Sequence, residues 1–223
     1  TGLAGDVTFN TGTGAGAITF DENLFGTQKL TLTTGAGNID FNSTVGTTSV
    51  LTGISATTTG NIAFDNTVAA GGSDINLTGA AVTFSGDVTT TNDGTIEVTN
   101  SGTLTISGDI NSDGYFLQNG AGAVTLGGDI ITTEDNISLV GAVTVSGDQK
   151  VSTTTNTASG GNITFDSTIN DGTKLTLNVG TGTLSLDGVV GGSTAITELV
   201  ISTNSALTLA NTVTVGTTGL DIT

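Results

Sequence analysis

Four aspartates recur at similar intervals and could act together. Each follows a glycine in the phrase Ser-Gly-Asp or Gly-Gly-Asp, and they are Asp87, Asp109, Asp129 and Asp148. If each stood on one turn of a repeating β fold, the carboxylates would stack about 4.8 Å apart. Such a column could supply an acid/base pair for glycan cleavage, or oxygen ligands for Ca²⁺. It could also cap surface turns, because Asp beside Gly is typical of turns.

Residue types favour turn capping, and the other two interpretations stay open. The four aspartates are the candidate metal ligands, for calcium, and we expect no other cofactor. Catalysis has less support, because His, Cys and Arg are absent and Tyr115 is the single Tyr of a chain without Trp. Little aromatic surface is therefore available for sugar stacking. We expect no enzyme activity.

A second acidic group lies in short, turn-like connections such as Asn92-Asp93-Gly94. Turn residues of successive repeats should follow one another along one edge of the molecule. We therefore expect a solvated, solubilising acidic edge. Its members are Asp74, Asp93, Asp113, Asp135 and Asp171.

The elements that would position these residues are copies of the phrase Gly161–Ile169, in which Ile-Thr-Phe is followed by three small polar residues and one aliphatic residue. We call the third residue of the Ile-Thr-Phe alternation the anchor. The residue two before the anchor is aliphatic in every copy, and the residue between is mostly Thr. The residue four after the anchor is aliphatic except at Gln149. The anchors are Phe20, Phe41, Phe64, Phe84, Ile106, Leu126, Val145, Phe165, Leu186 and Leu209.

Successive anchors are about 21 residues apart, and a looser strand such as Ile96-Glu-Val98 precedes many of the copies. Such a period, with glycine turns and alternating aliphatic residues, predicts a stack of parallel coils. We therefore predict an all-β fold: a right-handed parallel β-helix of about ten rungs, continuous over residues 1–223. Two β-sandwich domains are the competing interpretation. The segment Gln149–Gly160 should form a bulge or projecting loop, and Val50–Gly60 a milder lengthening.

Composition restricts the partners. The chain has 20 acidic residues against three lysines, Lys29, Lys150 and Lys174, and a formal charge of −17. This charge would repel nucleic acids and anionic lipids, so neither is expected as a partner. No apolar stretch is long enough for a membrane span. The chain opens on Thr1 and carries half-rungs at both ends. We expect a segment of a longer array, or a subunit whose ends stack on like copies.

Several phrases resemble the β-strand repeats of very large bacterial surface proteins. They are Gly-Asn-Ile-x-Phe-Asp-x-Thr-Val/Ile, the stretch Gly122–Ile130 and the stretch Val189–Ile196. The chain is similar in these phrases to filamentous haemagglutinin-like adhesins and related exoproteins. This resemblance implies an extracellular shaft or filament at the bacterial cell surface. Its role would be adhesion, cell–cell contact or matrix formation, with glycans or proteins of host or neighbouring cells as partners.

Overall fold

A computed structural model describes residues 1–155 and 158–223, and these residues form strands and no helix. The strands make three sheets, here called sheets I, II and III, in which all neighbours pair in parallel. Sheet I contains, in stacking order, β1 (Val7–Asn10), β3 (Lys29–Thr33), β5 (Gly53–Thr57), β8 (Ile75–Gly79), β11 (Ile96–Asn100), β14 (Phe116–Gln118), β17 (Ile137–Leu139), β20 (Ile163–Phe165), β23 (Leu184–Leu186) and β25 (Leu207–Leu209).

The other two sheets have eight strands each. Sheet II contains β2 (Ile18–Phe20), β4 (Ile39–Phe41), β6 (Ile62–Phe64), β9 (Val82–Phe84), β12 (Leu104–Ile106), β15 (Val124–Leu126), β18 (Val143–Val145) and β21 (Ile169–Asn170). Sheet III contains β7 (Val68–Ala70), β10 (Val88–Thr90), β13 (Ile110–Ser112), β16 (Ile130–Thr132), β19 (Asp148–Ser152), β22 (Lys174–Gly180), β24 (Ile196–Thr203) and β26 (Val215–Ile222).

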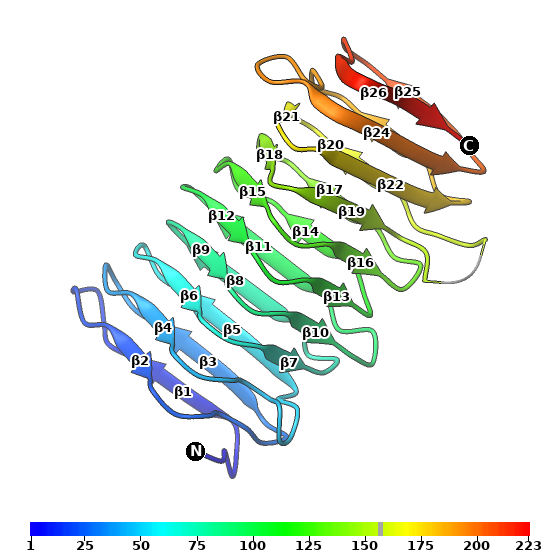
Figure 1. Ribbon diagram of the computed structural model, residues 1–223. Helices are drawn as coiled ribbons and strands as arrows, with labels where there is room; N and C mark the ends of the chain where they lie inside the picture. Colours follow the sequence, from blue (N-terminus) through cyan, green and yellow to red (C-terminus); the bar gives the residue numbers. More distant parts are fainter. Residues whose placement is uncertain (156–157) are drawn as a thin grey trace.

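The chain visits sheets I, II and III in turn, and each circuit forms one rung. The rungs stack from β1 and β2 near the N-terminus to β25 and β26 near the C-terminus (Figure 1). Isolated bridges continue sheet III through Leu24, Val45 and Val68, and sheet II through Val190 and Val213. The predicted parallel β-helix with a repeat of roughly 21 residues is confirmed.

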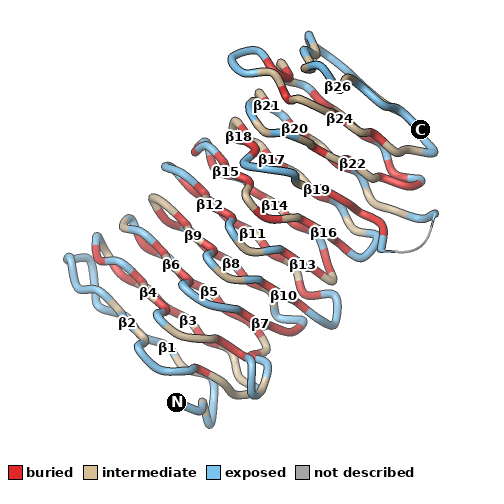
Figure 2. Tube along the Cα trace, in the orientation of Figure 1, coloured by how far each residue is buried: buried red, intermediate tan, exposed pale blue. Residues whose placement is uncertain are grey.

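The interior is built by two-residue alternation. Most three-residue strands bury their first and third side chains and turn the second outward, as Val124 and Leu126 do around Thr125. Successive rungs therefore deliver aliphatic side chains to one continuous core. Figure 2 shows buried residues recurring from rung to rung along the stack. In sheet II a ring stack runs through the first four anchors, and the centroids of Phe41 and Phe64 are 4.4 Å apart. Burial of this apolar surface is the main favourable contribution to folding.

The anchors do not all stack in one sheet. The first seven anchors lie in sheet II, but Phe165, Leu186 and Leu209 lie in sheet I. Only β19 separates Val145 from Phe165, whereas both β16 and β17 separate Leu126 from Val145. Because the looser strand is missing from that interval, every later copy of the phrase lies in sheet I instead of sheet II. We call residues 18–145 the regular region and residues 163–223 the shifted region.

The change occurs in the segment expected to be irregular. Val151, not Gln149, enters the buried column of sheet III by pairing with Ile130. Ten residues, 153–162, then connect β19 to β20, where four, 133–136, connect β16 to β17. Thr153 and Thr154 are buried, and the Thr153 hydroxyl donates to the carbonyl of Gly161 at 2.9 Å. Two residues of the predicted loop, 156 and 157, lie outside the described residues.

Candidate functional site

Three of the four candidate metal ligands form a single column. Asp87, Asp109 and Asp129 immediately precede β10, β13 and β16, at the corner between sheets II and III. The Oδ1 atom of Asp87 accepts the backbone N–H of Asp109 at 2.9 Å, and Asp109 accepts that of Asp129 at the same distance. Each carboxylate therefore satisfies a backbone donor of the next rung, which is capping chemistry.

The fourth candidate lies outside the column. Asp129 accepts the backbone N–H of Lys150 at 2.8 Å, so Lys150 takes the next place. Asp148 begins β19, pairs with Lys174 and contacts the hydroxyl of Thr173. The displacement follows from the buried column: because Val151 fills the place expected for Gln149, the residues before it are displaced by two positions. The predicted column of four aspartates is therefore a column of three.

The column has the geometry of a surface cap. Across residues 1–155 and 158–223, no three His, Cys, Asp or Glu side chains lie close enough together to share a metal ion. Calcium binding by Asp87, Asp109, Asp129 and Asp148 stays a prediction, to be tested by melting the protein with calcium and with chelator. Asparagines cap other corners in the same way: Asn162 accepts the backbone N–H of Thr183 at 2.8 Å.

Four of the five aspartates predicted for the acidic edge follow one another along one edge of the stack. Asp74, Asp93, Asp113 and Asp135 lie in the connections from sheet III to sheet I. Asp171 follows β21 and so lies at the corner between sheets II and III, because of the shift. Asp74 and Asp93 adopt left-handed backbone angles, with φ near 67° and 59°, which Asp tolerates better than most residues.

Charge is concentrated where this edge ends. Partial burial raises the pKa of Asp135, and the neighbouring carboxylates of Asp93, Asp113 and Glu134 raise it further. Burial, with a smaller contribution from Asp65, also raises the pKa of Asp40 on the outer side of sheet II. Folding therefore brings Asp135 close to the other carboxylates of the edge, and Asp40 close to Asp65, and each approach disfavours the ionised form.

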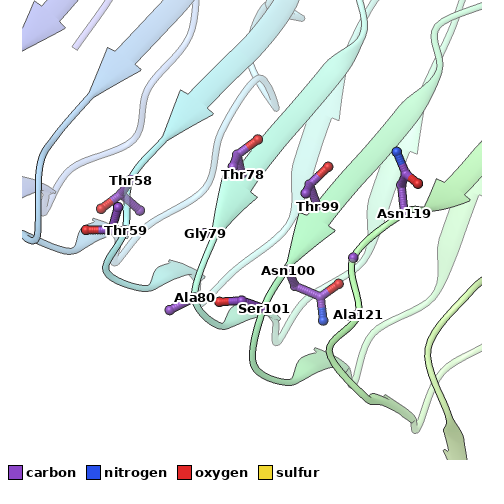
Figure 3. Close-up of a pocket in the computed structure, with 11 residues that line it drawn as sticks. Thr58, Thr59, Thr78, Gly79, Ala80, Thr99, Asn100, Ser101, Asn119 and Ala121 are labelled. Carbon is purple, nitrogen blue, oxygen red and sulfur yellow. The ribbon is translucent and has the colours of Figure 1, made fainter.

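The surface also has hollows that sequence reasoning missed. One, of about 390 Å³, crosses several rungs where sheet I turns into sheet II (Figure 3). Thr78, Thr99 and Asn119 line it from three successive rungs, and Ala80 and Ser101 line it from the turns that follow. A second, of about 260 Å³, lies on the outer side of sheet I. It is lined by Tyr115, Phe116, Leu117, Asn136 and Ser138.

These hollows could not be read from spacing, because they depend on which turns become neighbours. One signal was present: Tyr115 and Leu117 are apolar where the corresponding residues of most rungs are polar. The described part of the chain contains no helix long and apolar enough to cross a membrane. Comparison with known protein families, with curated proteins and with solved structures gives no match.

Proposed function

We propose that the chain is a structural, non-catalytic shaft of an extracellular bacterial adhesin or filament. The observation that carries the proposal is the continuous stack of parallel rungs around one core. Such a stack builds an elongated rod. Repeat folds of this kind extend by adding rungs, since each rung contacts only its neighbours. The carboxylates most suggestive of chemistry cap backbone donors.

The end rungs support a further part of this proposal, which is stacking on like copies or on adjacent repeats. Four of the most exposed large apolar side chains lie at the two ends, Phe9 near one and Leu209, Leu220 and Ile222 near the other. Ile222 is 49% exposed and belongs to β26, the outermost strand of sheet III. β26 pairs with β24 on one side only, and a strand with an unpaired outer edge and apolar side chains is a template for another strand.

Stacking is tested with the purified chain by light scattering over a range of concentrations and by electron microscopy. We expect rods that lengthen with concentration. The double substitution Leu220→Lys and Ile222→Lys should leave short particles, since charges on this edge oppose pairing. A matched control, Thr89→Lys and Thr144→Lys, adds the same charge to exposed positions of β10 and β18, away from the ends of the stack, and should form rods as the parent does. Monodisperse monomers of the parent at every concentration would overturn end-to-end stacking.

Adhesion and location are tested separately. Antibodies raised against the chain should label intact bacteria that make the protein, and beads coated with the chain should attach to cells. Labelling only after the cells are broken, or beads that attach no better than uncoated ones, would contradict an adhesive surface role.

A further inference from the structure

The rung that contains β14 breaks two polar columns at neighbouring positions. The residue just before each sheet I strand is polar in the surrounding rungs, and Tyr115 is the exception. The next outward residue is also polar around it, and Leu117 is the exception. The residues that correspond to Tyr115 are Asp74, Thr95, Asn136, Asn162 and Thr183, and those that correspond to Leu117 are Asn76, Glu97, Ser138, Thr164 and Ser185.

This apolar pair is not needed for the core. Phe116 between them is fully buried, while Tyr115 is 38% exposed and Leu117 is partly exposed on the opposite, outer side of the strand. Two such residues on otherwise polar columns leave apolar surface in water without a packing gain. Together with the hollow that they line, they form the kind of exposed apolar surface that is common at interaction sites.

The hollow is held in a fixed shape. The Tyr115 carbonyl accepts the backbone N–H of Ile96 at 3.0 Å. Behind Leu117, the fully buried side chain of Gln118 donates to Oδ1 of Asn100 at 2.7 Å and accepts the N–H groups of Val140 and Gly141. These bonds connect three rungs under the surface. A rigid surface loses little entropy when it binds a ligand.

The larger hollow, lined by threonine, serine, asparagine and small residues, begins just beyond the end of β14. Asn119, two residues beyond Leu117, lines the larger hollow together with Thr78 and Thr99 of the preceding rungs (Figure 3). None of the residues that line either hollow is charged. The combined surface offers an aromatic ring and an aliphatic side chain next to amides and hydroxyls, which can both donate and accept hydrogen bonds.

We propose that this face binds an uncharged glycan chain, with a sugar ring packed on Tyr115 and Leu117 and its hydroxyls bonded to Asn119, Asn136 and Ser138. A sugar has the same combination of an apolar face and a rim of donors and acceptors. The charge of the protein excludes anionic glycans: the formal charge is −17, no lysine lines either hollow, and Glu97 lies beside Leu117. This inference rests on the proposed adhesive function and names its ligand class.

The test is a glycan array probed with the purified chain, followed by calorimetric titration with the uncharged oligosaccharides that bind. We expect binding by the parent, a loss of about tenfold or more in affinity with Tyr115→Ala, and a change within about threefold with Tyr115→Phe, which keeps the ring. Leu117→Ser, which copies the next rung, should weaken binding also. The control Thr183→Ala alters the corresponding position in a distant rung and should have no effect.

Thermal melting shows that each variant is folded. The proposal is overturned if the parent binds no uncharged glycan at millimolar concentration, if it binds only anionic glycans or a protein ligand, or if the folded Tyr115→Ala variant binds as the parent does. Bead attachment to cells separates this proposal from the adhesive one. If beads coated with Tyr115→Ala still attach to cells, the adhesive function stands and this binding site is ruled out as its cause. If the parent binds a glycan on the array but does not attach to cells, the binding site stands and the adhesive function is ruled out.

Discussion

The regular and shifted regions use the same sequence phrase on different sides of the rod. Phe84, an anchor of the regular region, is buried in sheet II, and Phe165, an anchor of the shifted region, is equally buried in sheet I. The inward alternation is what the stack requires, because a buried aliphatic column must be continued by the next rung. The outward residues have no such requirement. A phrase can therefore move to another sheet and keep the core intact, while its surface residues move with it.

The effect on the surface is that columns end at the boundary between the regions. The carboxylate column passes from Asp129 to Lys150, and the acidic edge does not include Asp171. Glycines show the same change. At the corner between sheets II and III, Gly128 stacks directly on Gly108, whereas Gly147, in the same position of its phrase, has no stacked backbone neighbour. The surface pattern therefore differs between the two regions, while both contribute buried residues to the same core.

The glycines give the largest expected effect. A Cβ added at Gly128 would lie 2.2 Å from the carbonyl oxygen of Gly108, so Gly128→Ala must separate two rungs. We expect a loss of about 4 kcal/mol or an unfolded protein, in the range of severe steric substitutions. At Gly147 the nearest atom is Nε2 of Gln149 at 3.6 Å, and only the positive φ of 81° opposes a side chain. Gly147→Ala should therefore cost about 1–2 kcal/mol.

Denaturant unfolding followed by circular dichroism measures both values. Gly14→Ala is the control, because a Cβ there meets nothing within 4 Å and its φ is ordinary. Equal losses at Gly128 and Gly147 would show that the stacked column continues through the boundary, contrary to the structure.

The sequence was sufficient to predict the fold and most of the interior. Two-residue alternation at a fixed spacing identifies parallel coils, and it located the anchors of the regular region correctly. The shift could not be predicted from the phrase, because the same alternation is buried in sheet II in the regular region and in sheet I in the shifted one. Val151 was the available signal: read two residues beyond Gln149, the aliphatic column is unbroken. The hollow at Tyr115 depends on contacts between turns, and these follow only from the three-dimensional stack.

Two glutamines, one in the regular region and one at the boundary, test whether a side chain inside the stack contributes more to stability than one at the boundary. Gln118 is fully buried in the regular region, and its Oε1 atom accepts the N–H groups of Val140 and Gly141 at 2.9 and 2.8 Å. Gln118→Ala leaves the N–H of Gly141 without its acceptor and removes the donor to Oδ1 of Asn100, while the N–H of Val140 keeps the backbone carbonyl of residue 118 at 3.2 Å. We expect a cost of about 2–3 kcal/mol. Gln149, at the boundary, donates to the exposed carbonyl of Ser146 at 2.7 Å. Gln149→Ala should stay within about 0.5 kcal/mol of the parent. Denaturant midpoints measure both, and a Gln149 loss as large as that of Gln118 would contradict the structure.

The smallest expected effect concerns the acidic edge, through Asp135 in the regular region and Asp171 in the shifted one. Burial first, and then Asp93, Asp113 and Glu134, raise the pKa of Asp135, so folding disfavours its ionised form. A raised carboxylate pKa lowers stability at pH values above the folded pKa, and this penalty disappears below the unfolded value, about 3.9. Asp135→Asn should therefore stabilise the protein at neutral pH and become neutral in effect at acid pH.

Because Asp135 is largely solvated, the gain should be below about 1 kcal/mol, or at most about 3 °C in Tm for a chain of this size. Added salt should reduce it. Asp171→Asn is the matched control: it removes the same charge away from the edge and keeps the side-chain oxygen that accepts the N–H of Gly172. Melting curves of both variants at neutral and acid pH measure the two gains. If both variants gain equally, general charge reduction explains the gain, and the stacked edge of the regular region has no special electrostatic cost.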